Sequence, residues 1–515
     1  MKTLITLLIY PLALAFLTGC VDVSLEENTD GNVIETRSNA AGEDGYDYDE
    51  LADLFKEDVR MLDSLAPMTS ARYFAPAVPF THSAVLSLGR NLTTSTGIEK
   101  ILIIVDFSIY EQLRDEVERY AFDIYSAFGC AIVMERVSGG NPIDVKNLIL
   151  TYKTNLSGVV LIGDIPAARF EIEDDHYKYG HRAWPCDLYY TDLDGSWGDS
   201  NGNGIYDTHT GNIGPEIYLG RISTKNMGTL VSEKEGLVRY FDKNHDFWCG
   251  LTTVNRKSAL TYVDKDWIPF PYYKHDIQYL YGAANYVAKG YGDAGFGRAE
   301  YLSNLRNRAY EFIQLCCHAS YMRLAMTGGS IYANEIYENG TDAIGYNLFC
   351  CSACDWTSVS TNSPYGFLAG AHIYNPQNRS LVAVGSTKTG SMLKFKNFYT
   401  PLGQGKTIGE SLKIWWSGIL NDDEHYRISW FYGMTIIGDP LINFLYRVRS
   451  TSRIALNSFD TDNSATYRYV KASEEIQADN YAIPAGMKVI FNAPSVIMNA
   501  GFTCNPESTL VINNT

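Results

Sequence analysis

The chain has 515 residues, of which 46% are hydrophobic, 20% charged and 13% aromatic. This composition excludes a disordered, collagen-like or coiled-coil chain and predicts a globular protein of two or three domains. With 59 acidic against 42 basic residues the net charge is −17, which argues against nucleic acid as a partner, because that binding depends on Lys and Arg neutralising phosphates.

The N-terminus predicts a secreted, lipid-anchored protein. Lys2 precedes an apolar run at 4–16 that is too short to span a bilayer and that leads into Leu-Thr-Gly-Cys at 17–20. This ending resembles the lipobox of Bacteroidetes-type lipoproteins, whose cysteine thiol is acylated before cleavage. The resemblance implies a signal peptide at 1–19, lipidation of Cys20, and attachment to the bacterial outer membrane on its periplasmic or cell-surface face. An ordinary signal peptide followed by a chance cysteine is the alternative.

Residues 20–80 are predicted to form an acidic leader or linker. Between residues 21 and 65 there are 14 Asp or Glu and 3 Lys or Arg, a local net charge of −11. Such a charge run is typical of a solvated segment.

Residues 81–250 are predicted to form a first α/β subdomain. Short runs rich in Ile and Val alternate there with longer amphipathic segments, the pattern of βαβ units in a parallel sheet covered on both faces. The predicted strands are 101–107, 130–137, 158–166 and 216–223, and the predicted helices are 109–128, 142–152 and 227–244. The fold class is therefore α/β.

A second α/β subdomain is predicted at 251–447, followed by a small β module at 448–515. The strands expected in the second subdomain are 258–264, 312–320, 344–354 and 380–387, with a helix around 275–288. Ligand chemistry in parallel sheets lies at the carboxyl ends of strands. We therefore expect the functional site where two of these strands close on His318 and Cys351.

A histidine and a cysteine at strand ends suit thiol chemistry. A thiolate is a strong nucleophile, and an imidazole beside it can lower its pKa and later protonate a leaving amine. The backbone N–H groups of Ala319 and Cys351 lie at the same strand ends, where they can stabilise an oxyanion. The alternative is a core histidine with buried, inert thiols.

The sequence around these residues resembles the caspase-like cysteine peptidases, and the gingipains in particular. CCHAS (316–320) stands where that family has His-Gly-Ser, and FCCSACDW (349–356) is similar to its Ala-Cys-x-x-Gly-Asp-Phe. Four further gingipain-like pieces occur in the expected order over about 100–445: EIYLGR (216–221), HDIQ (275–278), VGST (384–387) and GDP (438–440). The resemblance implies two caspase-like subdomains and a cysteine endopeptidase that hydrolyses protein or peptide substrates without a catalytic cofactor.

The resemblance also implies residue roles. Matching Asp355-Trp356 to the family's Asp-aromatic pair makes Cys351 the nucleophile, with Cys354 as the alternative. His318 becomes the general base and acid, and Asp266, with Asp264 as the alternative, orients it. Ala319 departs from the family's glycine and restricts the backbone of the oxyanion donor.

One further residue is implied by resemblance to determine specificity. Asp276, in HDIQ, corresponds to the acid at the base of the specificity pocket of arginine-specific gingipains. A carboxylate there favours Arg or Lys side chains in the substrate. The alternative is a solvent-facing helix residue.

The loop at 192–207 resembles a calcium-binding loop. It carries oxygen-bearing side chains at alternate positions and a glycine at the sharp turn, which suits a hard cation with a structural role. The predicted ligands are Asp199, Asn201, Asn203 and Asp207. A metal-free turn rich in Asn and Asp is the alternative. A rival zinc site of Cys317, His318, Cys351 and Cys354 is disfavoured because these thiols lie in apolar strands.

Two other classes of function stay open. One is a non-catalytic surface-binding lipoprotein with a caspase-like shell, which the departure at Ala319 favours. The other is a cysteine transpeptidase, which transfers the acyl group to an amine. In the peptidase interpretation residues 21–80 form an inhibitory leader, although the sequence gives no reason to assign the inhibition to charge.

Overall fold

The computed structural model describes residues 46–64, 78–89, 98–252, 258–307, 309–376, 379–445, 453–456, 467–471 and 475–513. The predicted signal peptide at 1–19 and the predicted lipidation at Cys20 lie outside these residues. The chain divides into two units, Met1–Asp47 and Tyr48–Thr515, and the account below concerns the second. Every helix in the described ranges is too short or too polar to cross a lipid bilayer.

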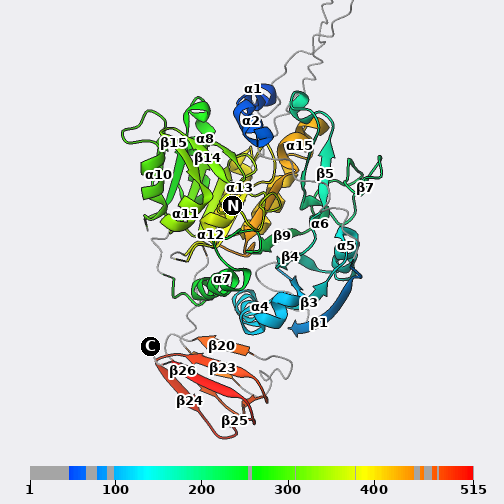
Figure 1. Cartoon of the computed structure of the whole chain (residues 1–515). Coiled ribbons are helices and arrows are strands. Elements are labelled where there is room, and N and C mark those ends of the chain that lie inside the picture. Colours follow the sequence, from blue (N-terminus) through cyan, green and yellow to red (C-terminus); the bar gives the residue numbers. More distant parts are fainter. Residues whose placement is uncertain are drawn as a thin grey trace, which may run out of the picture. The chain divides into compact units, whose positions relative to one another are not determined.

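An eleven-stranded sheet forms the centre of this unit, in the order β1-β3-β2-β4-β9-β18-β17-β16-β12-β10-β11 (Figure 1). Its strands are β1 (Thr81–Leu88), β2 (Lys100–Asp106), β3 (Ala131–Ser138), β4 (Leu156–Ile162), β9 (Tyr218–Ile222), β10 (Ala259–Val263), β11 (Tyr286–Gly290), β12 (Phe312–Cys316), β16 (Gly345–Phe349), β17 (Val382–Ser386) and β18 (Met434–Gly438). All neighbours are parallel except β1 with β3 and β17 with β18. The α/β fold with a mostly parallel sheet is confirmed.

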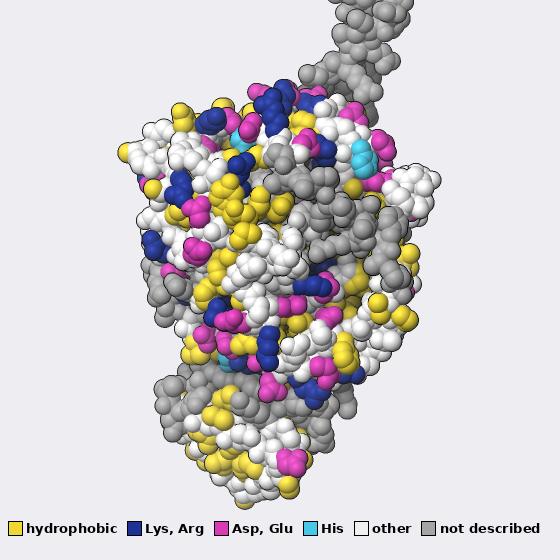
Figure 2. Space-filling model, viewed as in Figure 1, with side chains coloured by type: hydrophobic (Ala, Val, Ile, Leu, Met, Phe, Trp, Pro, Cys, Tyr) yellow, Lys and Arg dark blue, Asp and Glu magenta, His cyan; other side chains and the backbone are white. Residues whose placement is uncertain are grey.

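The inner strands are buried along their whole length, as in a parallel sheet that helices cover on both faces. The helices of this body are α3 (Phe107–Gln112), α4 (Arg114–Phe128), α5 (Pro142–Thr151), α6 (Leu188–Thr191), α7 (Glu233–Trp248), α8 (Pro271–His275), α9 (Gln278–Tyr281), α10 (Arg298–Leu305), α11 (Ala333–Asn339), α12 (Leu368–Ile373), α13 (Phe395–Gly403), α14 (Ile408–Ser417) and α15 (Glu424–Phe431). On the face shown in Figure 2, basic and acidic side chains are mixed rather than gathered by sign.

Three small sheets carry loops that matter for the site. They are the hairpin of β5 (Arg169–Ile172) and β6 (Arg182–Pro185), the hairpin of β7 (Ser196–Gly198) and β8 (Thr208–Thr210), and the sheet of β13 (His318–Ser320), β14 (Arg323–Met326) and β15 (Gly329–Tyr332). The short 3-10 helices η2 (Asp175–Tyr177) and η3 (Lys265–Trp267) lie in connecting segments.

Two acidic helices precede the sheet: α1 (Tyr48–Asp53) and α2 (Lys56–Ser64). Figure 1 shows them, in blue, next to α15, in orange. The Tyr48 ring stacks on Tyr426 of α15 at 5.1 Å, and the Tyr48 hydroxyl donates to Asp422 at 2.9 Å. This part of the predicted leader is therefore packed against the body instead of standing in solvent.

The helix predicted around 275–288 is wrong. Helix α8 ends at His275, and α9 ends at Tyr281, before Gly282, whose φ of 86° lies in the left-handed region that stops a helix. Residues 286–290 then form the edge strand β11, parallel to β10. The strand predicted at 344–354 is also too long, because Cys350–Cys354 form a turn after β16.

The predicted C-terminal strand region is confirmed, with an unexpected arrangement. Its strands are β19 (Arg453–Leu456), β20 (Tyr467–Lys471), β21 (Glu475–Ala478), β22 (Ala482–Ile483), β23 (Lys488–Asn492), β24 (Ser495–Met498), β25 (Thr503–Cys504) and β26 (Thr509–Asn513). All the pairs among them are parallel and join residues about 20 positions apart, such as Glu475 with Ser495. This is the pairing of a short solenoid.

Candidate active site

Three neighbouring strands of the sheet end in the predicted catalytic residues. In the order β16-β12-β10, β16 is followed by Cys351, β12 by His318 and β10 by Asp266. Because the three strands are parallel, their carboxyl ends lie at one edge of the sheet. Asp266 and Cys351, which are 85 positions apart in the sequence, are thus brought to the same edge of the sheet.

His318 is held between two carboxylates. Its Nε2 lies 2.8 Å from Oδ2 of Asp266, and its Nδ1 lies 2.8 Å from Oδ2 of Asp58. Burial lowers the pKa of His318, but the hydrogen bonds and charges of Asp58 and Asp266 more than offset this and raise it to about 9. The ring is therefore an imidazolium at neutral pH.

Asp266, and not the alternative Asp264, reaches the histidine. The Asp264 carboxylate accepts hydrogen bonds from the backbone N–H groups of Lys265 and Thr327 and from the Thr327 hydroxyl. It holds the turn after β10 in place, and that turn presents Asp266.

Asp58, on α2, lies in the middle of this arrangement. Its side chain is fully buried; Oδ1 accepts the Ala319 N–H at 2.7 Å, and the carboxylate lies near enough to the Cys351 thiol for its charge to raise the pKa of that thiol. Burial raises the pKa of Asp58, while the bonds from His318, Cys351 and Ala319 act in the opposite direction. One carboxylate thus contacts the predicted nucleophile, the predicted base and one predicted oxyanion donor.

The sequence analysis missed Asp58. It is one of 14 acidic residues in the leader, and neither its neighbours nor its spacing distinguishes it from the others. Its contact with His318 joins residues 260 positions apart.

Cys351 sits in the turn that follows β16. The next residue, Ser352, has a left-handed φ of 56°, and its N–H donates to the Lys388 carbonyl at 2.9 Å. Such backbone strain in a non-glycine residue persists only where the surroundings fix it. Burial and the Asp58 charge raise the pKa of the Cys351 thiol well above its usual value, so the thiol is protonated in this form.

The alternative nucleophile, Cys354, faces another direction. Its Sγ packs against β17 so closely that a Cβ on Gly385 would lie 2.9 Å from it, and its N–H donates to the Ser386 carbonyl at 3.0 Å. Among the contacts of the described residues, none joins Cys354 to His318 or Asp58. Of the four residues in the zinc alternative, Cys317 has its Sγ 3.8 Å from the Sγ of Cys350, which is not one of the four.

Ala319 fits the site in spite of its departure from the family's glycine. It lies in the extended strand β13, paired with Leu324, and is outside the residues with positive φ. Because L-residues adopt this backbone freely, its N–H can point at Asp58 without a glycine.

Asp276 lies at the end of α8. Burial raises its pKa to about 6, against the backbone hydrogen bond and positive charge of Lys396. The contacts described for this side chain link it to the α13 region and not to His318 or Cys351.

The predicted calcium loop lies in the β7–β8 hairpin. The Asp199 carboxylate accepts the N–H groups of Gly202, Asn203 and Gly204, and Asp207 accepts that of Ser200. The side-chain amides of Asn201 and Asn203 both donate to Oε1 of Glu171, at 2.7 and 2.8 Å. Glu171 is a buried carboxylate that the sequence analysis did not include.

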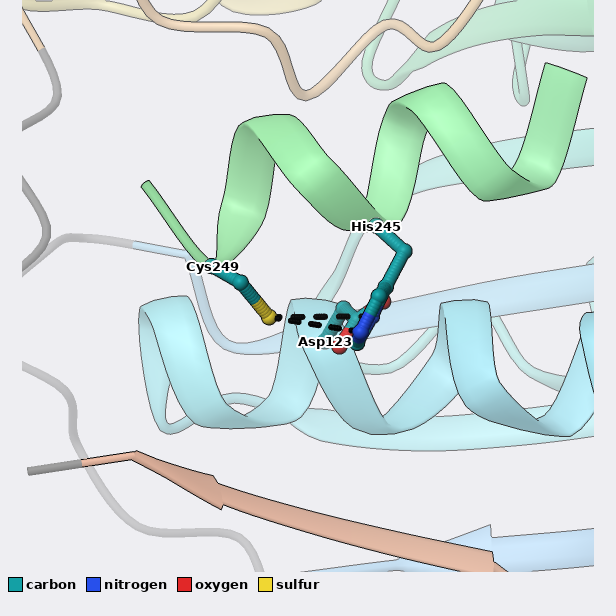
Figure 3. Close-up of side chains that lie close together, drawn as sticks. All are labelled: Asp123, His245 and Cys249. Carbon is teal, nitrogen blue, oxygen red and sulfur yellow. Dashed lines mark hydrogen bonds and ion pairs between the residues drawn. The ribbon is translucent and has the colours of Figure 1, made fainter. Parts of the chain in front are cut away.

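A second cluster of the same residue types lies between α4 and α7 (Figure 3). Asp123 Oδ2 is 2.8 Å from Nδ1 of His245, and Cys249 Sγ is 3.6 Å from both ring nitrogens. The sequence analysis missed this cluster, although the spacing of His245 and Cys249 on a helix places them one turn apart.

The large, mostly parallel sheet carries Cys351, His318 and Asp266 after the ends of three neighbouring strands. The sequence matches the model of peptidase family C25 over residues 123–445, and the chain belongs to this family. The prediction of a gingipain-like cysteine peptidase is confirmed.

One solved structure supports the fold, and a second is a weaker likeness. The crystal structure of the Arg-specific cysteine proteinase gingipain R (RGPB) matches with a TM-score of 0.50 and 14% sequence identity, over 70% of this chain and 83% of that one. A structure titled "Structure of Protease" matches with a TM-score of 0.44 and 13% identity, over 67% and 78% of the two chains. No curated protein matches.

Proposed function

We propose that this protein is an endopeptidase that uses a Cys351–His318 dyad, with Asp266 orienting the histidine. The observation that carries the proposal is the position of the Asp58 carboxylate. It is hydrogen-bonded to the His318 ring and to the Ala319 N–H, and its charge acts on the Cys351 thiol. An acceptor group bound by base and amide donor, beside the nucleophile, occupies the place that a reacting carbonyl needs.

The residues suit acyl transfer once Asp58 is absent. Cys351 passes its proton to Nδ1 of His318 and attacks the carbonyl carbon, and the oxyanion is stabilised by the N–H groups of Ala319 and Cys351. Nδ1 then protonates the leaving amine, and water hydrolyses the thioester. Throughout, Asp266 accepts the Nε2–H and stabilises the imidazolium.

In the form described, the enzyme is latent. Asp58 fills the position of the substrate carbonyl, and burial together with the Asp58 charge keeps the Cys351 thiol protonated. The pairs Lys178–Asp53 (2.7 Å) and Arg182–Asp63 (2.9 Å) also attach the α1–α2 segment, although such exposed pairs contribute little. We therefore assign inhibition by the leader mainly to the Asp58 carboxylate, which the sequence alone does not distinguish from the other acidic residues.

Peptide hydrolysis by full-length variants tests the proposal. We expect Asp58→Ala to release activity that is low in the natural chain, and Asp58→Ala/Cys351→Ala to abolish it. Activity in the Cys351→Ala background, or none in any variant, contradicts the proposal; the latter result favours a binding protein. Adding a primary amine and weighing the products shows whether acyl transfer to the amine competes with hydrolysis.

Cleavage after Arg or Lys stays a prediction from the resemblance to gingipains. It requires the Asp276 carboxylate to face the substrate, whereas Lys396 is its nearest described partner. Comparison of Arg, Lys, Asn and Asp substrates in the Asp58→Ala chain tests it, with Asp276→Asn as the variant that removes the charge.

We also propose that the 199–207 loop binds calcium in a structural role. The donor set fits, because the side chains of Asn201 and Asn203 bond the buried Glu171, and Asp199 and Asp207 add carboxylates on the same hairpin. The two asparagine amides can rotate to turn their oxygens toward the ion. We expect EDTA to lower the melting temperature and calcium to restore it, with a smaller response in Glu171→Gln.

Lipid attachment at Cys20 is proposed from the N-terminal sequence. It implies localisation at the bacterial outer membrane, with the membrane as a partner. Radiolabelled palmitate should be incorporated into the natural chain and not into Cys20→Ser.

A further inference from the structure

Phe55, one turn before Asp58, fills an aromatic pocket. Only 1% of its surface is exposed, and its ring centroid lies 5.1 Å from Trp430, 6.2 Å from Phe349, 6.3 Å from His176 and 6.4 Å from Trp267. The Phe55 carbonyl accepts the Val59 N–H at 3.0 Å, so residues 55 and 58 share one side of a helical turn.

Two walls of this pocket belong to the catalytic centre. Trp267 follows Asp266 directly, and its ring lies 4.6 Å from that of His318. Phe349 is the last residue of β16, two positions before Cys351, and its ring lies 5.8 Å from Trp267. A side chain in this pocket therefore lies next to the reacting atoms.

The other two walls are fixed by contacts that do not involve Phe55. His176 packs edge-on against Trp430 at 5.2 Å, and the His176 N–H donates to the Ser429 hydroxyl at 3.1 Å. Asp175, the acid beside His176, is paired with the buried Lys388 at 2.9 Å. The pocket thus has its own support, and its neighbouring carboxylate is already neutralised, so it offers an aromatic surface rather than a partner for a cation.

We propose that the Phe55 pocket is a substrate subsite that takes an aromatic or large apolar side chain flanking the scissile bond. The inference rests on the proposed function and deepens it. In the latent form α2 uses the subsite for its own Phe55, while the Asp58 carboxylate fills the catalytic centre. The helix is an inhibitor and not a substrate, because it presents a side-chain carboxylate, which has no leaving amine, where a peptide carbonyl would react.

Cleavage of a peptide mixture by the full-length Phe55→Ala/Asp58→Ala chain, in which neither side chain fills its place, tests the subsite. Mass spectrometry of the products should show Phe, Tyr, Trp or Leu enriched about tenfold at one position beside the cut. Enrichment of Arg or Lys, of Asp, or of no residue at that position overturns the inference, while the endopeptidase proposal stands.

A substitution in the pocket distinguishes a loss of substrate preference from a loss of the catalytic centre. In the Phe55→Ala/Asp58→Ala background, Trp430→Ala should lower kcat/KM for the aromatic substrate about tenfold while Cys351 is still alkylated by iodoacetamide. The control Trp248→Ala, on α7, should keep the preference. An unchanged preference in Trp430→Ala refutes the subsite, whereas loss of both cleavage and Cys351 alkylation in Asp58→Ala itself refutes the proposed function.

Discussion

Two clusters in this molecule contain the same three residue types, and they differ in what surrounds them. At the strand ends, the His318 ring lies between Asp266 and Asp58, and the Ala319 N–H donates to the same Asp58 carboxylate, whose charge raises the pKa of the Cys351 thiol. Between α4 and α7, Cys249 Sγ is equally far from both nitrogens of His245, so it lies in line with neither. Residue types alone do not make a thiol peptidase site; at the strand ends an amide donor and a histidine ring converge on one acceptor.

The largest expected difference between the clusters concerns their cysteines. In the Asp58→Ala background, Cys351→Ala should remove peptide hydrolysis by a factor of about 10³ or more, because the nucleophile is lost. Cys249→Ala should leave kcat/KM within about twofold. Equal losses in both variants, measured with one fluorogenic peptide, contradict the assignment of Cys351.

The second largest difference is expected between the acidic residues of the two clusters, Asp266 and Asp123. Asp266→Asn removes the charge that orients His318, and we expect kcat to fall by about 10²–10⁴ with a small change in KM. Asp123→Asn changes the acid beside His245 and should affect thermal stability rather than kcat. If Asp266→Asn changes KM alone, Asp266 is a binding residue and not the orienting acid.

A smaller effect distinguishes the two histidines by pH. The pKa of His318 is raised from 6.5 to about 9 in the folded chain, so its contribution is fully present below about pH 6.5 and is lost as the pH rises through about 9. The shift corresponds to at most about 3 kcal/mol of unfolding free energy. Denaturant unfolding of the natural chain should show that the unfolding free energy falls over this pH range. The same fall is expected in His245→Gln but not in His318→Gln. A pH profile of His318→Gln that is identical to that of the natural chain contradicts the two-carboxylate geometry.

Much of the fold was predictable, for a physical reason. Strands such as β2, β4 and β12 are buried on both faces and therefore read as continuous apolar runs. The edge strand β11 is only partly buried and lacks that pattern, so the sequence predicts a helix over part of it instead. In the C-terminal region the strands were visible, but their parallel pairing was not, because it joins unlike residues such as Arg453 and Glu475.

The residues of the candidate site also fall into those that the sequence predicts and those that it does not. His318 and Cys351 were found because polar residues after apolar strands are local signals in the sequence. Asp58 and Phe55 were not, because their function depends on a helix that packs on residues more than 200 positions away. No local pattern encodes such a contact.

The account depends on Asp58 covering a reactive Cys351, and the alkylation rate of that thiol tests it most directly. Each variant is treated with iodoacetamide at pH 7, and the alkylated cysteines are mapped by mass spectrometry. Cys351 should be alkylated slowly in the natural chain and at least about tenfold faster in Asp58→Ala. Asp63→Ala, on the same helix α2, is the matched control and should react like the natural chain. Equal rates in the natural chain and Asp58→Ala, or modification of Cys354 in place of Cys351, would contradict the account.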